Sequence, residues 1–326
     1  MTQAGPVANA VVADRLGKRF GATNALTDVS FTVASGELFG FIGPDGAGKT
    51  TLFRILTTLM LPSQGRAEVL GLEVTSKLWE LRRRVGYMAG RFSLYPDLSV
   101  KENLRFFASV FGTTVEREMP IIEPIYRQIA PFGDRRASAL SGGMKQKLAL
   151  CCALVHRPEI LFLDEPTTGV DAVSRREFWD LLDTLKRSGL TIVVSTPYMD
   201  EAARCDRIAL IQRGRILAID TPDAVTRSFG RTMFGVRAAD RHRLLTAVRD
   251  YPETHSAYPF GETLHYTDRR TDRPASAIIA ELGAFLASQG MADARVTEVP
   301  ATIEDVFIDR MGAPEAPEPD TAGVAR

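Results

Sequence analysis

The sequence predicts an α/β protein in which a mostly parallel sheet is covered by helices on both faces, followed by a small α+β domain. Two observations support this prediction. Up to about residue 228, continuous apolar runs rich in β-branched residues alternate with segments whose apolar residues have helical spacing. Strands that are apolar on both faces are typical of parallel sheets buried between two helical layers. After residue 228 this alternation ends and a mixture of strand-like and helix-like pieces begins.

The elements of the first part follow from local signals. Turn residues bound each strand, and the last two strands form a hairpin that turns at Arg213 and Gly214. Ser99 is suited to be an N-cap, and Gly189 ends a later helix. We expect strands at 29–34, 37–42, 85–88, 160–164, 190–195 and 206–220. We expect helices at 52–60, 99–112, 140–156 and 174–189.

The second part is predicted to be a separate domain at residues 229–310. Its strand-like and helix-like pieces lie at 232–238, 241–250, 262–267, 276–289, 294–299 and 302–311. The remaining residues, 311–326, are rich in Pro, Glu and Ala and carry almost no core-forming side chains. We therefore predict a disordered tail.

Bulk composition excludes several classes of function. Lys+Arg and Asp+Glu balance at 40 each in 326 residues, so charge does not indicate nucleic acid as a partner. The adjacent pair Cys151 and Cys152 lies in an apolar helical run, where small core residues are expected, and three cysteines make no disulfide framework. No signal peptide and no stretch of about 20 apolar residues is present, so any membrane role is expected to depend on a partner.

The segment GPDGAGKT, residues 43–50, fits the pattern G-x-x-x-x-G-K-[ST] between an expected strand and an expected helix. Its glycines let the backbone turn N–H groups toward phosphates, Lys49 adds a positive charge at the β- and γ-phosphates, and Thr50 offers a hydroxyl to Mg²⁺. The positive end of the following helix faces the same anion. A Gly-rich turn that holds Lys-Thr by chance is the alternative, but the flanking strand and helix favour a phosphate loop.

The apolar strand ILFLD ends in the carboxylates Asp164 and Glu165. The carboxyl ends of parallel strands meet at one edge of the sheet, so both acids are expected beside the phosphate loop. Asp164 could hold the Mg²⁺ shell, and Glu165 could orient and deprotonate a water molecule near the γ-phosphate. Two solvated acids at a strand end would be the better interpretation if the phosphate loop were absent.

The segment LSGGMKQ, residues 140–146, opens a helix with a serine and two glycines, which form a second possible anion cradle. One chain does not need two cradles for one triphosphate. The second is useful if it closes over a nucleotide that another copy holds. Ser141, Gly142 and Gly143 are therefore candidate nucleotide contacts across a dimer interface.

In this order and spacing, GPDGAGKTT, LSGGMKQK and ILFLDEPTTGVD resemble the nucleotide-binding domain of ATP-binding cassette (ABC) proteins over about residues 10–228. The resemblance implies a P-loop NTPase fold for residues 1–228. Its parts would be a RecA-like, mostly parallel core sheet, an antiparallel β subdomain and a helical signature subdomain at about residues 90–157. The segment PATIEDVF, residues 300–307, resembles the C-terminal motif of drug-export and daunorubicin-resistance ATPases.

The resemblance assigns roles to single residues. It implies that Phe20 stacks on adenine, with a core phenylalanine as the alternative, and that Asp171 lies along a dimer seam. Ser141 and Gly143 would reach the γ-phosphate of the opposing subunit. Catalysis would depend on Glu165 and Lys49, and Mg²⁺ on Thr50 and Asp164. The nucleotide-binding set would comprise Phe20, Gly43, Pro44, Asp45, Gly46, Ala47, Gly48, Lys49, Thr50, Thr51, Ser141, Gly142 and Gly143.

Three positions depart from the family pattern. Asp45 stands where asparagine is usual, Gly90 where a glutamine contacts metal and water, and Pro197 where a histidine contacts the γ-phosphate. Proline has neither a side-chain donor nor an N–H group, so Pro197 cannot replace that histidine. The pattern predicts reduced hydrolysis, and it predicts that restoring Gln at 90 and His at 197 raises the rate.

The function expected from the resemblance is that of an ATPase subunit of a membrane exporter. It would bind Mg-ATP at a dimer interface, on the cytoplasmic face of the membrane, and drive efflux through separate permease subunits. The second nucleotide-binding domain could be another copy or a different cassette. The segment from about 92 to 111 would contain the groove for the permease, lined by residues 91–100. The alternative is a regulatory cassette with little or no hydrolysis, and the sequence leaves the transported substrate open.

Overall fold

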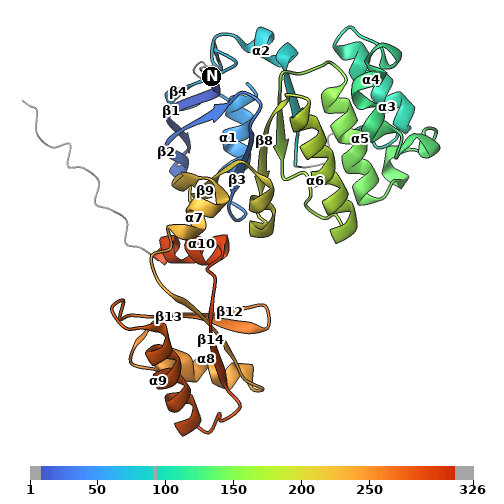
Figure 1. Ribbon diagram of the computed structural model, residues 1–326. Coiled ribbons are helices and arrows are strands. Elements are labelled where there is room, and N and C mark those ends of the chain that lie inside the picture. The colour runs from blue at the N-terminus through green and yellow to red at the C-terminus, as the bar shows by residue number, and fades with distance from the viewer. Residues whose placement is uncertain (1–8, 91–93, 313–326) are drawn as a thin grey trace, which may run out of the picture. The chain divides into compact units, whose positions relative to one another are not determined.

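The computed structural model describes residues 9–90 and 94–312, and the chain divides into two compact units, residues 1–222 and 223–326 (Figure 1). The predicted disordered tail lies outside the described residues, except for residues 311–312 at the end of a helix. Within the described ranges, no helix combines the length and the apolar character that a membrane span requires.

The first unit is built on a six-stranded sheet in the order β10-β9-β3-β8-β7-β6. Its neighbours are parallel, except that β9 and β10 form an antiparallel hairpin. The strands are β3 (Leu38–Ile42), β6 (Val85–Met88), β7 (Ile160–Asp164), β8 (Thr191–Thr196), β9 (Arg207–Gln212) and β10 (Arg215–Asp220). Every residue of β3, β7 and β8 is buried, as predicted for a parallel sheet covered on both faces.

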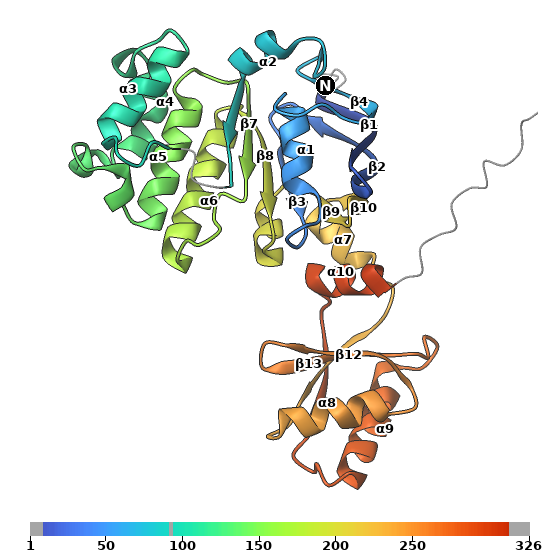
Figure 2. The same cartoon turned by 180° about the vertical axis from the view of Figure 1, so that it is seen from behind.

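Helices cover the two faces of this sheet. The helix α1 (Lys49–Leu56) lies on one face, whereas α5 (Gly142–Leu154) and α6 (Ala172–Arg187) lie on the other (Figures 1 and 2). The cysteines predicted as core residues, Cys151 and Cys152, are buried in α5. This arrangement brings the carboxyl ends of β3, β6, β7 and β8 to one edge of the sheet, where the predicted motifs lie.

An antiparallel sheet in the order β2-β1-β4-β5 packs against α1 on the side away from the core sheet (Figure 2). Its strands are β1 (Asn9–Phe20), β2 (Thr23–Ala34), β4 (Gln64–Val69) and β5 (Leu72–Glu73). Edge-to-face aromatic contacts join the layers, because the ring of Phe41 lies 4.9 Å from that of Phe31 and 5.9 Å from that of Phe53. This sheet is the antiparallel subdomain that the resemblance implied.

The other helices of the first unit are α2 (Leu78–Arg84), α3 (Val100–Val110) and α4 (Val115–Tyr126), and a 3₁₀ segment, η3, spans Met199–Arg204. The predicted cap of α3 is confirmed. The Ser99 Oγ accepts from the Glu102 N–H at 3.2 Å, and the Ser99 N–H donates to the Glu102 carboxylate at 2.7 Å. These bonds hold the pKa of Glu102 below its usual range. By contrast, α4 contains Pro120 and Pro124, and local patterns do not predict it as a helix.

The second unit contains a four-stranded antiparallel sheet in the order β12-β13-β11-β14. Its strands are β11 (Met233–Arg237), β12 (Thr254–Phe260), β13 (Thr263–Asp268) and β14 (Arg295–Val299), and its helices are α8 (Arg241–Asp250), α9 (Ala275–Ser288) and α10 (Ile303–Gly312). A short helix, α7 (Pro222–Arg227), begins this part of the chain. Side chains of α8 and α9 pack with Phe234, Val236 and Tyr266 in a separate apolar core.

Candidate functional site

The predicted phosphate loop connects the end of β3 to the start of α1. Gly48 has φ 105°, a left-handed conformation that favours glycine, and a Cβ added there would lie 2.6 Å from the Ala25 carbonyl oxygen. The Gly43 N–H donates to the Thr196 carbonyl at 3.2 Å, and the Gly214 N–H donates to the Ala47 carbonyl at 2.9 Å. Neighbouring strand ends and turns therefore fix both ends of the loop.

Lys49 lies at the centre of this site. Only 3% of the residue is exposed, and its Nζ donates to the carbonyl oxygens of Gly43 at 2.7 Å and Pro44 at 2.9 Å. The same Nζ lies 3.0 Å from the Glu165 Oε1. A phosphate held by Lys49 would thus lie beside the carboxylate of Glu165, which is the juxtaposition expected from the motifs.

Ser195 of β8 orders the two carboxylates at the end of β7. The Ser195 Oγ donates to the Asp164 Oδ1 at 2.7 Å and accepts from the Glu165 N–H at 3.0 Å. Glu165 has φ 50°, an uncommon left-handed conformation for a side-chain-bearing residue. Sequence patterns did not identify Ser195, and its only signal is a buried hydroxyl at the end of the apolar run TIVVST.

The pair Asp164 and Thr50 fits the oxygen ligands that Mg²⁺ prefers. Asp164 is buried, and in the described part of the chain its Oδ2 accepts no hydrogen bond. Thr50 lies in the first turn of α1. Among the described residues no cluster of three His, Cys, Asp or Glu side chains could hold a metal ion, so phosphate or water would have to complete the coordination. Burial and the negative charge of Asp164 raise the pKa of the nearby Tyr87 to about 12.

Ser141 is the N-cap of α5, and its Oγ accepts from the Met144 N–H at 3.4 Å. Ser141 and Gly142 are exposed at the start of this helix. Within the described residues no hydrogen bond joins them to the phosphate loop of their own chain. Instead this helix start lies against residues 169–174, because a Cβ added at Gly143 would lie 2.7 Å from the Ser174 Oγ.

Asp171 is the N-cap of α6 and accepts from the N–H groups of Val173 at 3.1 Å and Ser174 at 2.9 Å. These bonds hold the pKa of Asp171 below its usual range. Since Gly143 lies against Ser174, the predicted dimer-seam loop and the start of α5 are neighbours within one chain.

Phe20 ends β1 and is 48% exposed, with the Lys18 Nζ 5.2 Å from the ring centroid. The core alternative for this ring is wrong, because a core phenylalanine would be buried. The adjacent strand β2 passes beside the phosphate loop at Ala25. An exposed ring in this position is suited to stack on a base.

Gly90 and Pro197 both lie beside the carboxylate site. A Cβ added at Gly90 would lie 2.8 Å from the Asp164 carbonyl oxygen and 3.7 Å from the Glu165 Cβ. The backbone here is too close for a Cβ unless it shifts, so Gly90→Gln is not expected to contribute to the predicted rise in rate. Pro197 follows Thr196, whose carbonyl holds the phosphate loop, so a side chain at 197 would begin next to the phosphates.

A groove of about 440 Å³ lies between the core sheet and the helical subdomain. Its lining comes from the residues that follow α1, from α2 and β6, and from α3, α5 and the residues just after these two helices. The lining residues are Thr57, Leu59, Trp79, Arg82, Arg83, Val85, Tyr87, Phe107, Val110, Phe111, Ala149, Cys152, Ala153 and His156. Trp79 is 75% exposed. Residues 94–100 do not line it and residues 91–93 lie outside the described ranges, so the described lining differs from the predicted one.

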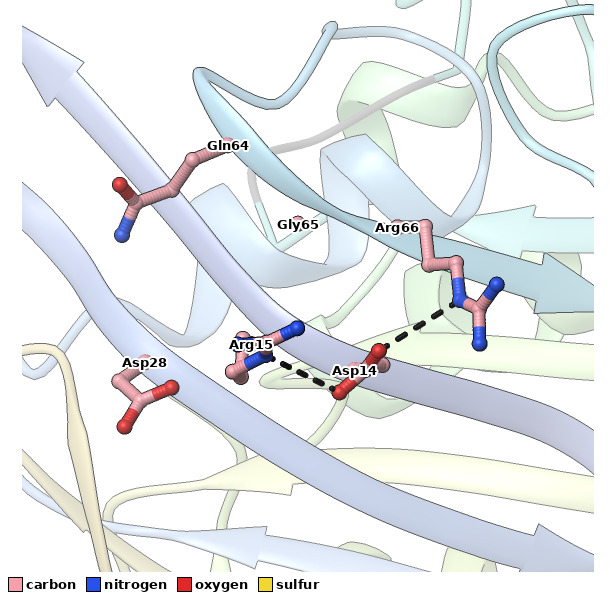
Figure 3. A pocket seen from close by; sticks show the side chains of 6 residues that line it. All are labelled: Asp14, Arg15, Asp28, Gln64, Gly65 and Arg66. Carbon is pink, nitrogen blue, oxygen red and sulfur yellow. Dashed lines mark ion pairs between the residues drawn. The ribbon is translucent and has the colours of Figure 1, made fainter.

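A second hollow, of about 590 Å³, lies on the antiparallel sheet where β1 shifts register against β2 and β4 (Figure 3). Asp14 lies 3.5 Å from both Arg15 and Arg66 in ion pairs across its floor. These groups are exposed and already paired with one another, and none of the predicted site residues lines this hollow.

Comparisons with known proteins identify the family of this chain. Residues 26–168 match the sequence model of the ABC transporter family. A probable multidrug ABC transporter ATP-binding protein from Escherichia coli is 44% identical over 223 residues, which are 67% of this chain but only 38% of that protein. The Nod factor export ATP-binding protein I of Bradyrhizobium diazoefficiens is 36% identical over 300 residues, 90% of this chain and 94% of the relative.

Two solved structures give the same result for the fold. The ATP-binding subunit of an ABC transporter has a TM-score of 0.61 and 29% identity, and the match covers 68% of this chain and 93% of that subunit. A dimeric ATP-binding cassette in a post-hydrolysis state, bound to ADP and Pi, has a TM-score of 0.60 and 25% identity, and the match covers 65% of this chain and 98% of that cassette. The predicted P-loop NTPase fold and the resemblance are confirmed: the chain belongs to the ABC transporter family, among its ATP-binding components.

Proposed function

We propose that this chain hydrolyses Mg-ATP at an interface between two copies and thereby drives export through separate membrane subunits. The contact of 3.0 Å between the Lys49 Nζ and the Glu165 Oε1 is the observation that carries this proposal. It brings a phosphate-binding cation and a candidate base to one point. The names of the relatives, which refer to a multidrug transporter and to Nod factor export, support the assignment to export.

In the proposed reaction, Glu165 takes a proton from a water molecule whose oxygen attacks the γ-phosphorus. The bond to the bridging β–γ oxygen breaks, and ADP and phosphate are the products. Lys49 and the N–H groups of the phosphate loop stabilise the negative charge that develops on the phosphate oxygens. Ser195 holds Asp164 and the Glu165 backbone in fixed positions.

Mg²⁺ would be held by the Thr50 hydroxyl and Asp164, and when bound it would neutralise charge on the phosphates. The Ser195 hydroxyl, by occupying the Asp164 Oδ1, would leave the other carboxylate oxygen directed to the cation. This assignment is supported by the oxygen-only donor set and by the burial of Asp164.

The second half of each site would come from another copy of the chain. Ser141 and Gly142 are exposed at the start of a 13-residue helix, where free N–H groups and the helix dipole favour an anion. Because one chain carries both the phosphate loop and the signature segment, two copies form two complete composite sites. A pair of identical chains is therefore sufficient.

The membrane partner would dock in the groove lined by Trp79, Phe107 and Val110. Exposed apolar side chains beside the cations of Arg82 and Arg83 suit a short cytoplasmic segment of a permease that carries apolar and acidic groups. This partner would place the chain at the inner face of the cell membrane. We propose that residues 229–310 form an accessory domain, and that the permease selects the substrate.

Single-turnover hydrolysis of ATP by the purified protein tests this function. We expect a measurable rate in the wild type, and a rate lower by about 10²–10³-fold in Glu165→Gln, because the general base is removed while its shape is kept. ATP binding, measured separately, should be retained in the variant. Equal rates in both proteins would contradict the proposal and favour a regulatory cassette without hydrolysis.

A further inference from the structure

Glu201 is a buried acid that the proposed reaction does not use. It lies in η3, and 3% of the residue is exposed. Its Oε1 accepts from the Thr167 hydroxyl at 2.8 Å, and its Oε2 accepts from the Thr196 hydroxyl. The guanidinium of Arg175 lies 3.9 Å from the Oε1. A buried carboxylate is costly unless such groups compensate it, so these contacts are specific features of the fold.

The two threonines belong to different parts of the hydrolytic site. Thr167 follows Glu165 in the turn that the Thr168 N–H closes by donating to the Glu165 carbonyl at 3.2 Å. Thr196 ends β8, and its carbonyl accepts from the Gly43 N–H of the phosphate loop. Glu201 therefore connects the turn after the candidate base to the strand end that holds the phosphate loop.

Arg175 extends this connection toward the start of α5, where the predicted signature turn of Ser141, Gly142 and Gly143 lies. It lies in α6, where its N–H donates to the carbonyl of the N-cap Asp171 at 2.9 Å, and its guanidinium also lies over the ring of Tyr198 at 4.7 Å. The preceding residue, Ser174, is the one that a Cβ at Gly143 would meet at 2.7 Å. One carboxylate thus contacts segments that reach Glu165, the phosphate loop and the signature turn.

We propose that Glu201 is a positioning residue for ATP hydrolysis, which fixes the turn after Glu165 and the start of α6 against the end of β8. The inference rests on the proposed function. Its effect on the reaction is indirect, because Glu201 is buried and acts through Thr167, Thr196 and Arg175. Pro197 makes this anchoring more important, since the residue after Thr196 offers no donor of its own to the phosphates.

The test compares Glu201→Gln with the matched control Asp200→Asn. Both changes remove one carboxylate from neighbouring positions, but Asp200 is exposed. We expect Glu201→Gln to lower kcat by about 10–100-fold, because displacement of catalytic groups by about 1 Å has effects of this size. The Kd for ATP should change by less than about threefold, since the phosphate loop and Phe20 remain. Asp200→Asn should match the wild type in both quantities.

A second pair of variants separates positioning from simple support of the fold. Thr167→Val removes the hydroxyl that Glu201 accepts from, whereas Thr167→Ser keeps it. We expect Thr167→Val to lower kcat and Thr167→Ser to restore most of it, with nearly equal thermal unfolding. If the Glu201→Gln protein folds, the double variant with Thr167→Val should lose less than the product of the single losses, because both act through one contact.

The outcomes distinguish the two proposals. A wild type without hydrolysis contradicts the proposed function and this inference with it. If the wild type hydrolyses ATP and Glu201→Gln has an unchanged kcat, the inference alone is contradicted. If Glu201→Gln does not fold, an unchanged kcat in Thr167→Val contradicts it instead. A fall in kcat that only follows the loss of folded protein, or an equal fall in Thr167→Ser, would assign Glu201 a structural role and also overturn the inference.

Discussion

Pro197 and Gly90 differ in what their surroundings allow, although the sequence alone treats them as equivalent losses. Pro197 follows the strand end that holds the phosphate loop. Gly90 is pressed against the backbone of Asp164, where an added Cβ would lie 2.8 Å from a carbonyl oxygen. Spacing along the chain located both residues beside the site, but only the distances show that the backbone of Asp164 leaves no room for a side chain at position 90.

We therefore predict that Pro197→His raises kcat about tenfold, because it adds a donor near the transferred phosphate. Gly90→Gln should give no rise, and it should lower the thermal unfolding temperature because the backbone of β7 must shift. Steady-state ATPase rates and thermal unfolding measure these effects. As a control, Gly283→Ala places a methyl group where no atom lies within 4 Å, and it should leave both quantities unchanged or slightly improved. A rise with Gly90→Gln would show that this backbone contact is not a constraint.

Much of the site was predictable at this scale because its motifs are contiguous in the sequence. The phosphate loop, the acids after β7 and the signature turn each lie within a few residues. The contacts of Ser195 with Glu165 and of Thr167 with Glu201 were not predictable, because these hydrogen bonds join residues at least 30 positions apart in sequence. A single hydroxyl in a strand carries no pattern that identifies its partner.

Among the elements, α10 shows how a helix is fixed by one polar residue. Asp305 is fully buried and accepts hydrogen bonds from the Tyr258 hydroxyl, the His265 Nδ1 and the Thr302 N–H, each at 2.6 Å. Burial alone would raise the pKa of Asp305, but these bonds hold it below its usual range. The helix is thereby attached to β12 and β13 of the second unit.

This cluster predicts how the second unit responds to pH. A carboxyl group with a lowered folded-state pKa contributes stability above its unfolded pKa of about 3.9, and that stability is lost as pH falls through the folded value. We expect the unfolding free energy of the second unit to fall below about pH 4 in the wild type. Asp305→Asn should lose about 3 kcal/mol at neutral pH, because it removes a charge-assisted acceptor in a buried site.

Denaturant unfolding at pH 7 and at pH 3, followed by hydrogen exchange of the amide groups of the second unit, measures this effect. The exposed Asp250→Asn is a matched control and should behave as the wild type. If Asp305→Asn had wild-type stability at pH 7, the hydrogen bonds to Asp305 would not fasten α10.

Helices and strands were predictable from the sequence where their local signals, caps and apolar runs, are strong. The capped helices α3 and α5 and the buried strands β7 and β8 were predicted because their caps and apolar runs are unambiguous. Helix α4 was not, since Pro120 and Pro124 argue against a helix, whereas its packing against α5 and α3 is visible only in the fold. The lining of the groove beside Trp79 was not predictable for a related reason. Trp79 and His156 line it from elements 77 residues apart in sequence, and only the fold brings them together.

At the scale of the whole molecule, a complete nucleotide site would need two chains. Each chain places Lys49 against Glu165, but its own signature turn packs against residues 169–174 rather than against its own phosphate loop. The exposed Ser141, besides capping α5, would then close a site on another chain. Composition and motif order predicted the P-loop fold and this pairing, whereas the surface that reaches the membrane depends on side chains distant in sequence.

The most direct test is the mass of the Glu165→Gln protein in solution, measured by light scattering with and without saturating Mg-ATP. Slow hydrolysis should let the ATP-bound pair accumulate, so we expect the mass of one chain without nucleotide and of two chains with ATP. Adding Lys49→Ala or Ser141→Arg to this protein should return the mass to one chain. A single-chain mass at saturating ATP, or a two-chain mass that persists with each of these substitutions, would contradict the central claim that two copies close over shared nucleotide.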